Sequence, residues 1–132
     1  MWFQKKEQPP IRSLIGEGTC FEGELLFSDG LRIDGEVVGD IRAQGEGPTL
    51  LVVSEKARIR GRVKAGHVII NGEVIGPIES SEMLELQPKA RVAGEVRYRV
   101  LEMHAGANVD GDLRHIAAES RPSLTLAASN DG

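Results

Sequence analysis

The chain of 132 residues contains one phrase twice: "IDGEVVGDI" spans Ile33 to Ile41, and "INGEVIGPI" spans Ile70 to Ile78. Six seven-residue units of this kind begin at residues 19, 31, 57, 68, 90 and 107. Small or apolar residues fill the first, third and seventh places, and Gly fills the fifth place of every unit. This alternation predicts strands with one face turned inward. The Gly suits a corner, where a Cβ atom would crowd the neighbouring backbone.

Composition favours an all-β fold in a single domain. The apolar residues are mostly Val, Ile and Leu, with one Trp, one Tyr and three Phe. Branched side chains of this kind are typical of strands. Sixteen Gly and six Pro leave no window of helical length with apolar residues in helical spacing. A length of 132 residues fits one ordinary domain.

The spacing of the units predicts a triangular parallel β-helix. The steps between units are 12, 26, 11, 22 and 17 residues, which are near multiples of about five and a half. Three faces then form one coil of about 16 or 17 residues, and residues 15–116 form about six coils. The two opening phrases should lie on the same face, two coils apart. A left-handed hexapeptide helix would keep a phase of six, so the drifting phase and the general crossover preference favour right-handed winding.

The two ends of such a rod are its exposed surfaces. Residues 1–14 and 117–132 contain Pro and polar residues and read as flexible N-terminal and C-terminal arms, without a capping helix. An uncapped end coil has unpaired backbone groups and an apolar cross-section, which a second copy of the chain can cover. Repetition of that contact makes a filament. The alternative is that loops near Gly16 or the tail fold over the ends and keep the rod monomeric.

Residues 15–116 resemble the bactofilins, which are bacterial cytoskeletal polymer-forming proteins. The resemblance rests on the spaced G-E-V and G-D-I phrases, on Gly16-Glu-Gly18 at the start, and on the Pro-containing arms. It implies a right-handed β-helix that polymerises end to end without nucleotide, often at the inner membrane. It also implies a role in cell shape or morphogenesis, with cell-wall or morphogenesis proteins as candidate partners.

The family resemblance places the polymer contacts in the terminal coils. The candidates in the first coil are Ile15, Phe21, Leu25 and Phe27, and those in the last coil are Leu101, Met103, Val109 and Leu113. Val109 occupies the place where the family commonly has an aromatic residue, which predicts a smaller contact. The alternative is that all eight are ordinary core, an interpretation favoured for Phe21, Leu25, Met103 and Leu113.

The opening "MWFQKK" predicts a membrane-binding motif made of Trp2, Phe3, Lys5 and Lys6. Residues 1–14 carry a net charge of +2, whereas the whole chain carries −4, so the remainder is at −6. Aromatic side chains favour the membrane interface, and each Lys adds about 1 kcal/mol against anionic lipid. A filament would display many weak copies and gain avidity. Bactofilins often carry such an apolar-plus-Lys motif; the alternative is an arm without function.

The expected cellular location rests on the cysteine count and on the targeting and membrane-spanning signals that the sequence lacks. Cys20 is the single cysteine, and we find neither a secretory signal nor an apolar stretch of about 20 residues. We therefore expect a cytoplasmic protein that is peripherally associated with the inner membrane.

The sequence shows little that indicates catalysis. His67, His104 and His115 lack metal-ligand spacing, and neither a dinucleotide fingerprint nor a P-loop is present. We expect no catalytic site, cofactor, metal, nucleotide or nucleic-acid partner, although His67 and His104 could approach each other on one face. An alternating basic run is expected to form an outward stripe that faces Glu73 and Glu95 or an acidic partner; its members are Arg58, Arg60, Arg62 and Lys64.

The sequence therefore predicts a non-enzymatic scaffold that self-assembles through its terminal coils and is tethered to the inner membrane. Two alternatives stay open. One is an acyltransferase or carbonic anhydrase built on a left-handed hexapeptide helix. The other is a monomeric β-helix that regulates cell division by binding another filament.

Overall fold

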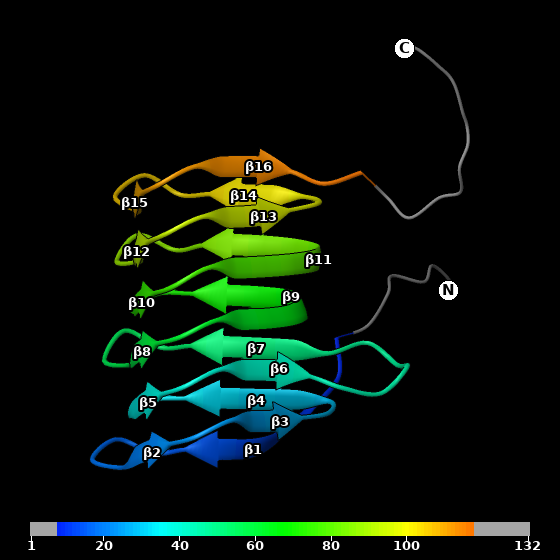
Figure 1. Ribbon diagram of the computed structural model, residues 1–132, viewed down its shortest axis with the longest axis vertical. Helices are drawn as coiled ribbons and strands as arrows, with labels where there is room; N and C mark the ends of the chain where they lie inside the picture. The colour runs from blue at the N-terminus through cyan, green and yellow to red at the C-terminus, as the bar shows by residue number, and fades with distance from the viewer. Residues whose placement is uncertain (1–7, 118–132) are drawn as a thin grey trace.

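The computed structural model describes residues 8–117, which form a rod of six stacked coils (Figure 1). Sixteen strands and no helix occur in this part of the chain, and every strand pair is parallel. Each coil passes through three faces. The predicted all-β parallel helix of about six coils is thus confirmed, while its right-handed winding stays a prediction.

The three faces are built from corresponding strands of successive coils (Figure 1). Face 1 contains β1 (Ile11–Ile15), β4 (Gly30–Ile33), β7 (Leu50–Val53), the second halves of β9 (Val63–Ile70) and β11 (Ile78–Leu86), and β14 (Leu101–Met103). Face 2 contains β2 (Cys20–Glu22), β5 (Glu36–Val38), β8 (Arg58–Arg60), β10 (Glu73–Ile75), β12 (Arg91–Ala93) and β15 (Asn108–Asp110). Face 3 contains β3 (Leu25–Phe27), β6 (Ile41–Ala43), the first halves of β9 and β11, β13 (Val96–Tyr98) and β16 (Leu113–His115).

Strand register stacks like side chains in columns along the rod. Leu31, Leu51, Val68 and Leu84 form one column, so the coils between them take 20, 17 and 16 residues. The longest of these coils contains the loop of residues 44–49, which the predicted period of about 16 or 17 residues does not include. Ile33 of the first phrase stacks on Val53, and Val53 stacks on Ile70 of the second phrase. The prediction that the two phrases share a face, two coils apart, is confirmed.

The core consists of these inward columns of Val, Ile and Leu. Ile59, for example, is fully buried and lies in register between Val37 and Val74 of the adjacent coils. Each core side chain contacts the coil above and the coil below, so stability accumulates from one coil interface to the next.

Glycines form the corner between faces 2 and 3. The fifth-place glycines of the repeat all lie at corners, as predicted, but at two different ones: Gly35 and Gly72 lie between faces 1 and 2, and the other four lie here. Gly39, Gly61 and Gly76 occupy this corner in successive coils, and each has a positive φ angle. A Cβ atom on Gly61 would lie 2.0 Å from the carbonyl oxygen of Gly39. The coils therefore approach more closely here than any side chain allows.

The corner between faces 1 and 2 alternates in length through coils 1 to 5, and the repeated phrase occurs at its two short turns. Coils 2 and 4, which contain the two phrases, turn with only two residues, 34–35 and 71–72. The other coils use four residues; these loops are 16–19, 54–57, 87–90 and 104–107, and Figure 1 shows them projecting beside β2, β8, β12 and β15. A short corner thus lies between longer loops.

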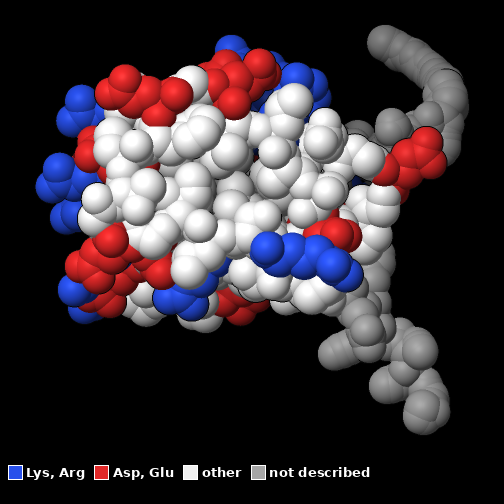
Figure 2. All heavy atoms as spheres, turned by 90° about the horizontal axis from the view of Figure 1, so that it is seen from below, with Lys and Arg blue, Asp and Glu red and all other residues white. Residues whose placement is uncertain are grey.

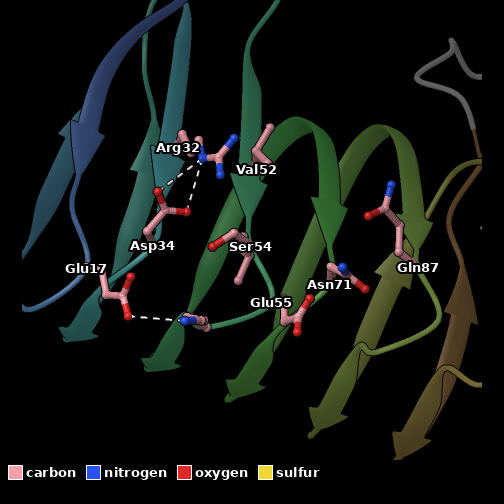
Figure 3. Close-up of a pocket in the computed structure, with 10 residues that line it drawn as sticks. Glu17, Arg32, Asp34, Val52, Ser54, Glu55, Asn71 and Gln87 are labelled. Atoms are coloured by element: carbon pink, nitrogen blue, oxygen red, sulfur yellow. Dashed lines mark hydrogen bonds and ion pairs between the residues drawn. The ribbon is translucent and has the colours of Figure 1, made fainter.

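Ion pairs bridge the longer loops across each short corner. Lys56 Nζ lies 3.4 Å from Glu17 Oε2, and Lys89 Nζ lies 3.1 Å from Glu55 Oε2 (Figure 3 shows the first pair). The pairs join coils 1 and 3 and coils 3 and 5. Glu17, Glu55 and Lys56 line a polar groove of about 490 Å³ along this corner, and Lys89 lines a second groove of about 410 Å³.

The helix begins earlier than the predicted boundary at Ile15. Strand β1 starts at Ile11, where its backbone pairs with Gly30 of β4. The carbonyl oxygen of Pro10 packs so closely on Gly30 that a Cβ atom there would lie 2.5 Å away. Residues 11–14 therefore belong to the first coil rather than to the predicted arm of residues 1–14.

Candidate polymerisation surfaces at the two ends

Both ends of the rod consist of strands with a neighbour on one side only. Strands β1, β2 and β3 pair with β4, β5 and β6, and β14, β15 and β16 pair with β11, β12 and β13. Within residues 8–117, no further strand or helix pairs with the outer edges. The open edges retain backbone N–H and C=O groups that another chain can pair with.

The register places all four first-coil candidates in inward columns. Ile15 stacks on Ile33, Phe21 on Val37 and Leu25 on Ile41. These three pack against the core on one side and are only half-buried, because no other coil of residues 8–117 covers their outer side. Phe27, stacked on Ala43, is only 5% exposed, so its ring offers little surface to a second copy. We therefore correct the prediction that Phe27 forms part of the contact and assign it to the core.

The four last-coil candidates also occupy inward columns. Leu101 and Val109 stack on Leu84 and Val92 and are half-buried. Met103 and Leu113 are 44% and 43% exposed, although the side chains beneath them in the same columns are fully buried. Within the described residues no further coil covers them, and at this exposure they are not ordinary buried core.

Sequence reasoning missed other apolar residues at the ends. Six of the eight exposed large hydrophobic residues lie in the terminal coils, and four of these were not predicted: Ile11, Leu14, Leu26 and Val100. Two of them precede the predicted boundary, which concealed them. Leu26 lies on the side of the first coil rather than in the end surface, because its column on face 3 points outward. Figure 2, a view onto the first coil, shows uncharged atoms across most of the end, with Asp, Glu, Lys and Arg around the rim.

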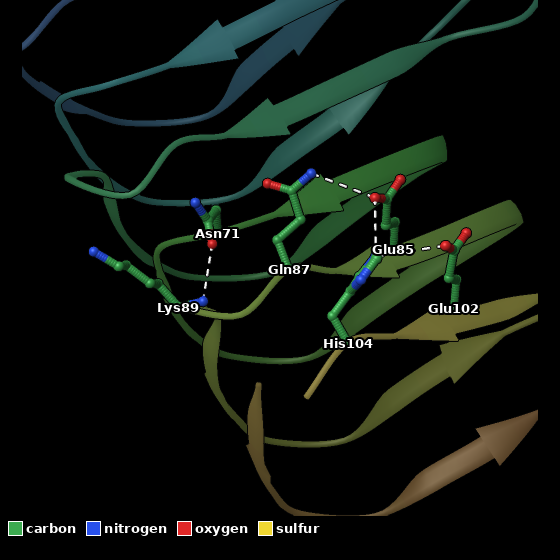
Figure 4. Close-up of polar contacts among 6 residues, drawn as sticks. All are labelled: Asn71, Glu85, Gln87, Lys89, Glu102 and His104. Atoms are coloured by element: carbon green, nitrogen blue, oxygen red, sulfur yellow. Dashed lines mark hydrogen bonds and ion pairs between the residues drawn. The ribbon is translucent and has the colours of Figure 1, made fainter. Parts of the chain in front are cut away.

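The fifth and sixth coils are joined by a polar cluster on face 1 (Figure 4). His104 Nε2 lies 3.3 Å from Glu85 Oε2 and 3.5 Å from Glu102 Oε2. Gln87 donates a hydrogen bond to the same Glu85 oxygen at 3.3 Å. The group of two carboxylates and one imidazole could hold a metal ion, and a hydrogen bond between the His104 ring nitrogen and Glu85 accounts for the same geometry. His67 is not part of it, because His67 stacks on Met83 at the other end of the face.

The predicted basic stripe does not form on one strand. Arg58 and Arg60 lie on β8, Gly61 turns the chain, and Lys64 lies on face 3. Arg58 Nε lies 3.7 Å from Glu73 Oε1, as the sequence predicted. Glu95 Oε2 lies 3.2 Å from Arg97 Nε and 2.9 Å from Arg114 Nε. Arg62 of the basic run lines the same surface pocket as Glu95, but among the described residues the two do not form an ion pair.

The predicted membrane motif of Trp2, Phe3, Lys5 and Lys6 lies outside the described residues. Within the described part of the chain, we find no helix that is long and apolar enough to cross a membrane.

Comparison with known proteins bears on the two open ends. Residues 13–114 match the family model described as "Bactofilin: Polymer-forming cytoskeletal". Bactofilin BacO of Myxococcus xanthus is 27% identical over 116 residues, covering 85% of this chain and 89% of BacO. Bactofilin BacP of the same organism is 24% identical over 99 residues, covering 75% of this chain and 40% of BacP.

A solved structure has a similar fold. It is the cryo-EM reconstruction of Thermus thermophilus bactofilin double helical filaments, and it matches with a TM-score of 0.63 and 28% sequence identity. The match covers 77% of this chain and 99% of that chain. The six-coil helix, its open apolar ends and the family match over residues 13–114 together show that the chain belongs to the bactofilin family of polymer-forming cytoskeletal proteins.

Proposed function

We propose that this chain is a non-enzymatic scaffold that assembles end to end into filaments without nucleotide. The observation that carries the proposal is the exposure of Met103 and Leu113 in columns whose other members are core. An added coil from a second copy would bury these side chains and pair the open strand edges in one step. Because the contact repeats at each subunit, it generates a linear polymer.

The filaments are further proposed to pair laterally and to lie at the inner membrane. The Thermus thermophilus relative is described as forming double helical filaments, which supports lateral association. Membrane attachment rests on Trp2, Phe3, Lys5 and Lys6 in a positively charged segment. A cytoplasmic, membrane-associated polymer of this kind would support cell shape or morphogenesis and bind cell-wall or morphogenesis proteins.

Electron microscopy of two matched variants tests the end contact. Leu113 and Leu26 are the same residue type with the same exposed fraction, 43%. Leu113 lies in an inward column of the last coil, whereas Leu26 lies in an outward column of face 3 with Arg42 and Lys64. Leu113→Arg introduces a charge into the end contact. Leu26→Arg introduces the same charge on the side of the first coil, outside the end contact.

We expect filaments in the parent and in Leu26→Arg, and isolated small particles in Leu113→Arg, all without nucleotide. Far-UV circular dichroism establishes that both variants are folded. Small particles in the parent at every salt and protein concentration would mean that the ends are capped. That outcome would favour the monomeric regulator of cell division.

Co-sedimentation with anionic vesicles tests membrane attachment. Deletion of residues 2–6 removes the aromatic and basic side chains, and we expect it to abolish co-sedimentation while filaments still form. Leu113→Arg retains the arm but should bind weakly, because a single copy lacks avidity. Unchanged co-sedimentation after the deletion would show that the arm does not attach the protein.

A further inference from the structure

We propose that face 2 is the lateral contact between two filaments, and that it binds face 2 of a second copy in antiparallel orientation. The two-fold axis lies between the two faces, along the strand direction, and passes between the third and fourth coils. This inference rests on the proposed filament, since it names the surface through which two filaments associate.

The first observation is the position of the exposed apolar side chains away from the ends. Among described residues, the two exposed large hydrophobic residues outside the terminal coils are Val38 and Ile75. Both lie on face 2, in one outward column with Arg60 between them. Neither face 1 nor face 3 has such a residue in coils 2 to 5. Apolar surface exposed midway along a rod is the part most readily stabilised by a lateral partner.

The second observation is the charge sequence of the neighbouring outward column. Glu36, Arg58, Glu73 and Arg91 stack in register through coils 2 to 5 and alternate in sign. Read in the reverse direction, the column has the opposite sign at every level. A second copy turned about the proposed axis therefore places Arg91 opposite Glu36 and Glu73 opposite Arg58. All four charged residues face an opposite charge, and such patterns fix the orientation of two partners.

The same rotation matches the apolar column. Val38 lies opposite Ala93 of the second copy, and the aliphatic stem of Arg60 lies over Ile75, as long basic side chains commonly do. A parallel arrangement about an axis along the rod would instead place Arg58 opposite Arg60. Antiparallel pairing is therefore the orientation that avoids a facing pair of like charges in the central coils.

The corner loops are complementary under the same rotation. The longer loop 54–57 of the third coil meets the level of the short corner 71–72, and loop 87–90 meets the level of corner 34–35. Loops and short corners thus alternate in opposite phase in coils 2 to 5, whereas the four-residue loops 16–19 and 104–107 of the first and last coils meet each other. The like-charged pair created by the rotation is Glu22 opposite Asp110, which lies in the terminal coils, where solvent screens the repulsion.

Charge exchange provides the main experiment. The single variants Glu36→Arg and Arg91→Glu each place like charges opposite one another at two symmetric positions. We expect single rather than paired filaments by cryo-electron microscopy. The double variant E36R/R91E restores opposite charges across the contact, so we expect paired filaments again. Arg97→Glu, in the same coil but on face 3, is the matched control and should leave the pairs unchanged.

The double variant also excludes a role confined to one chain. Within a chain, it places an arginine at position 36 beside Arg58 and a glutamate at position 91 beside Glu73, which worsens the column. If the column served only folding, the double variant would be the most impaired of the three. Paired filaments that persist in both single variants, or that are not restored in the double variant, would overturn the proposal.

Crosslinking reads the contact independently of filament imaging. A Cys20→Ser chain with Glu36→Cys and Arg91→Cys has its two thiols three coils apart, about 14 Å at the usual strand spacing. A short bis-maleimide can then join them only between copies across face 2. We expect a covalent dimer, and only background dimer in the control with Glu36→Cys and Arg97→Cys. Equal yields would refute face 2 as the contact, whereas absence of filaments in the parent would refute the end-to-end proposal.

Discussion

Three glycine substitutions separate backbone strain from close approach between coils. Gly47 has a φ angle outside the left-handed region, and a Cβ atom there meets nothing within 4 Å. Gly45, in the same loop, has a φ angle of +94° and equally open surroundings. Gly61 has a φ angle of +150°, and its Cβ atom would lie 2.0 Å from the carbonyl oxygen of Gly39. The change to Ala should therefore have three different effects.

Magnitudes follow from these surroundings. Gly47→Ala should raise the free energy of unfolding by about 0.4–1 kcal/mol, because it restricts the unfolded chain. Gly45→Ala should lower it by about 1–2 kcal/mol through backbone strain. Gly61→Ala has the same kind of strain and, in addition, a clash between the new Cβ atom and the carbonyl oxygen of Gly39. These two atoms must move apart to at least 3.0 Å. This parts the coils where Gly39 N donates to Arg60 O at 2.9 Å. Losing one or two such bonds at about 1 kcal/mol each brings the total to about 3 kcal/mol.

Urea unfolding followed by far-UV circular dichroism provides the measurement. All variants should carry Leu113→Arg, because assembly would otherwise add to apparent stability in a concentration-dependent way. The expected order of midpoints is Gly47→Ala, parent, Gly45→Ala and Gly61→Ala, from highest to lowest. If Gly61→Ala lowers the midpoint no more than Gly45→Ala, the reasoning fails, and the corner glycines serve only their φ angle.

Two further predictions concern the core and acid stability. Ile59→Ala leaves a cavity between fully buried neighbours and should lower the free energy of unfolding by about 2–5 kcal/mol, measured by urea unfolding in the Leu113→Arg background. The neighbouring Ser54 hydroxyl, and after it the Arg32 guanidinium that donates to the carboxylate, lower the pKa of Asp34 below its usual value of 3.8. The stabilisation is present above pH 3.8 and is lost as the pH falls through the lowered folded-state pKa. Ser54→Ala should reduce this acid-side loss in unfolding midpoints recorded from about pH 5 to pH 2.

Alternation in the sequence predicts the columns well, because a strand has only two faces. Phe21 and Val109 were placed inward from their position in a seven-residue unit, and the register confirms both positions. The glycine in each unit marked a corner because glycine interrupts a strand, which is a property of the local sequence. These features depend on neighbours along the chain, so local pattern was sufficient.

Features that depend on contacts between coils could not be predicted in this way. Ile11 and Leu14 follow a Pro-Pro pair and precede the first repeat unit, and only pairing with β4 makes them a strand. The run from Arg58 to Lys64 alternates without interruption, so its pattern does not show that Gly61 turns it onto another face. The charge column of face 2 draws one residue from each coil, and its order emerges only when unequal loops fix the register.

The charges at the ends and on face 2 predict opposite responses to salt. Residues 11–29 contain four acidic residues and Arg12, and residues 100–117 contain three acidic residues and Arg114, so both ends are acidic. Electrostatic repulsion therefore opposes contact between any two ends, whether the subunits join head to head or head to tail. Face 2, in contrast, brings opposite charges together. Surface interactions of both kinds are screened as the Debye length falls from about 30 Å at 0.01 M to about 8 Å at 0.15 M.

Raising the salt concentration over that range should accordingly lengthen filaments while separating pairs into single filaments. Sedimentation of the assembled fraction measures the first response, and filament width in electron micrographs measures the second. Filaments of the Glu36→Arg variant should lengthen with salt as those of the parent do. They should remain single, however, at every salt concentration. Shorter filaments at high salt would mean that attraction between charges, rather than the apolar columns ending at Met103 and Leu113, dominates the end contact. If the fraction of paired filaments instead rises with salt, the apolar contact of Val38 and Ile75 contributes more to pairing than the charge column on face 2.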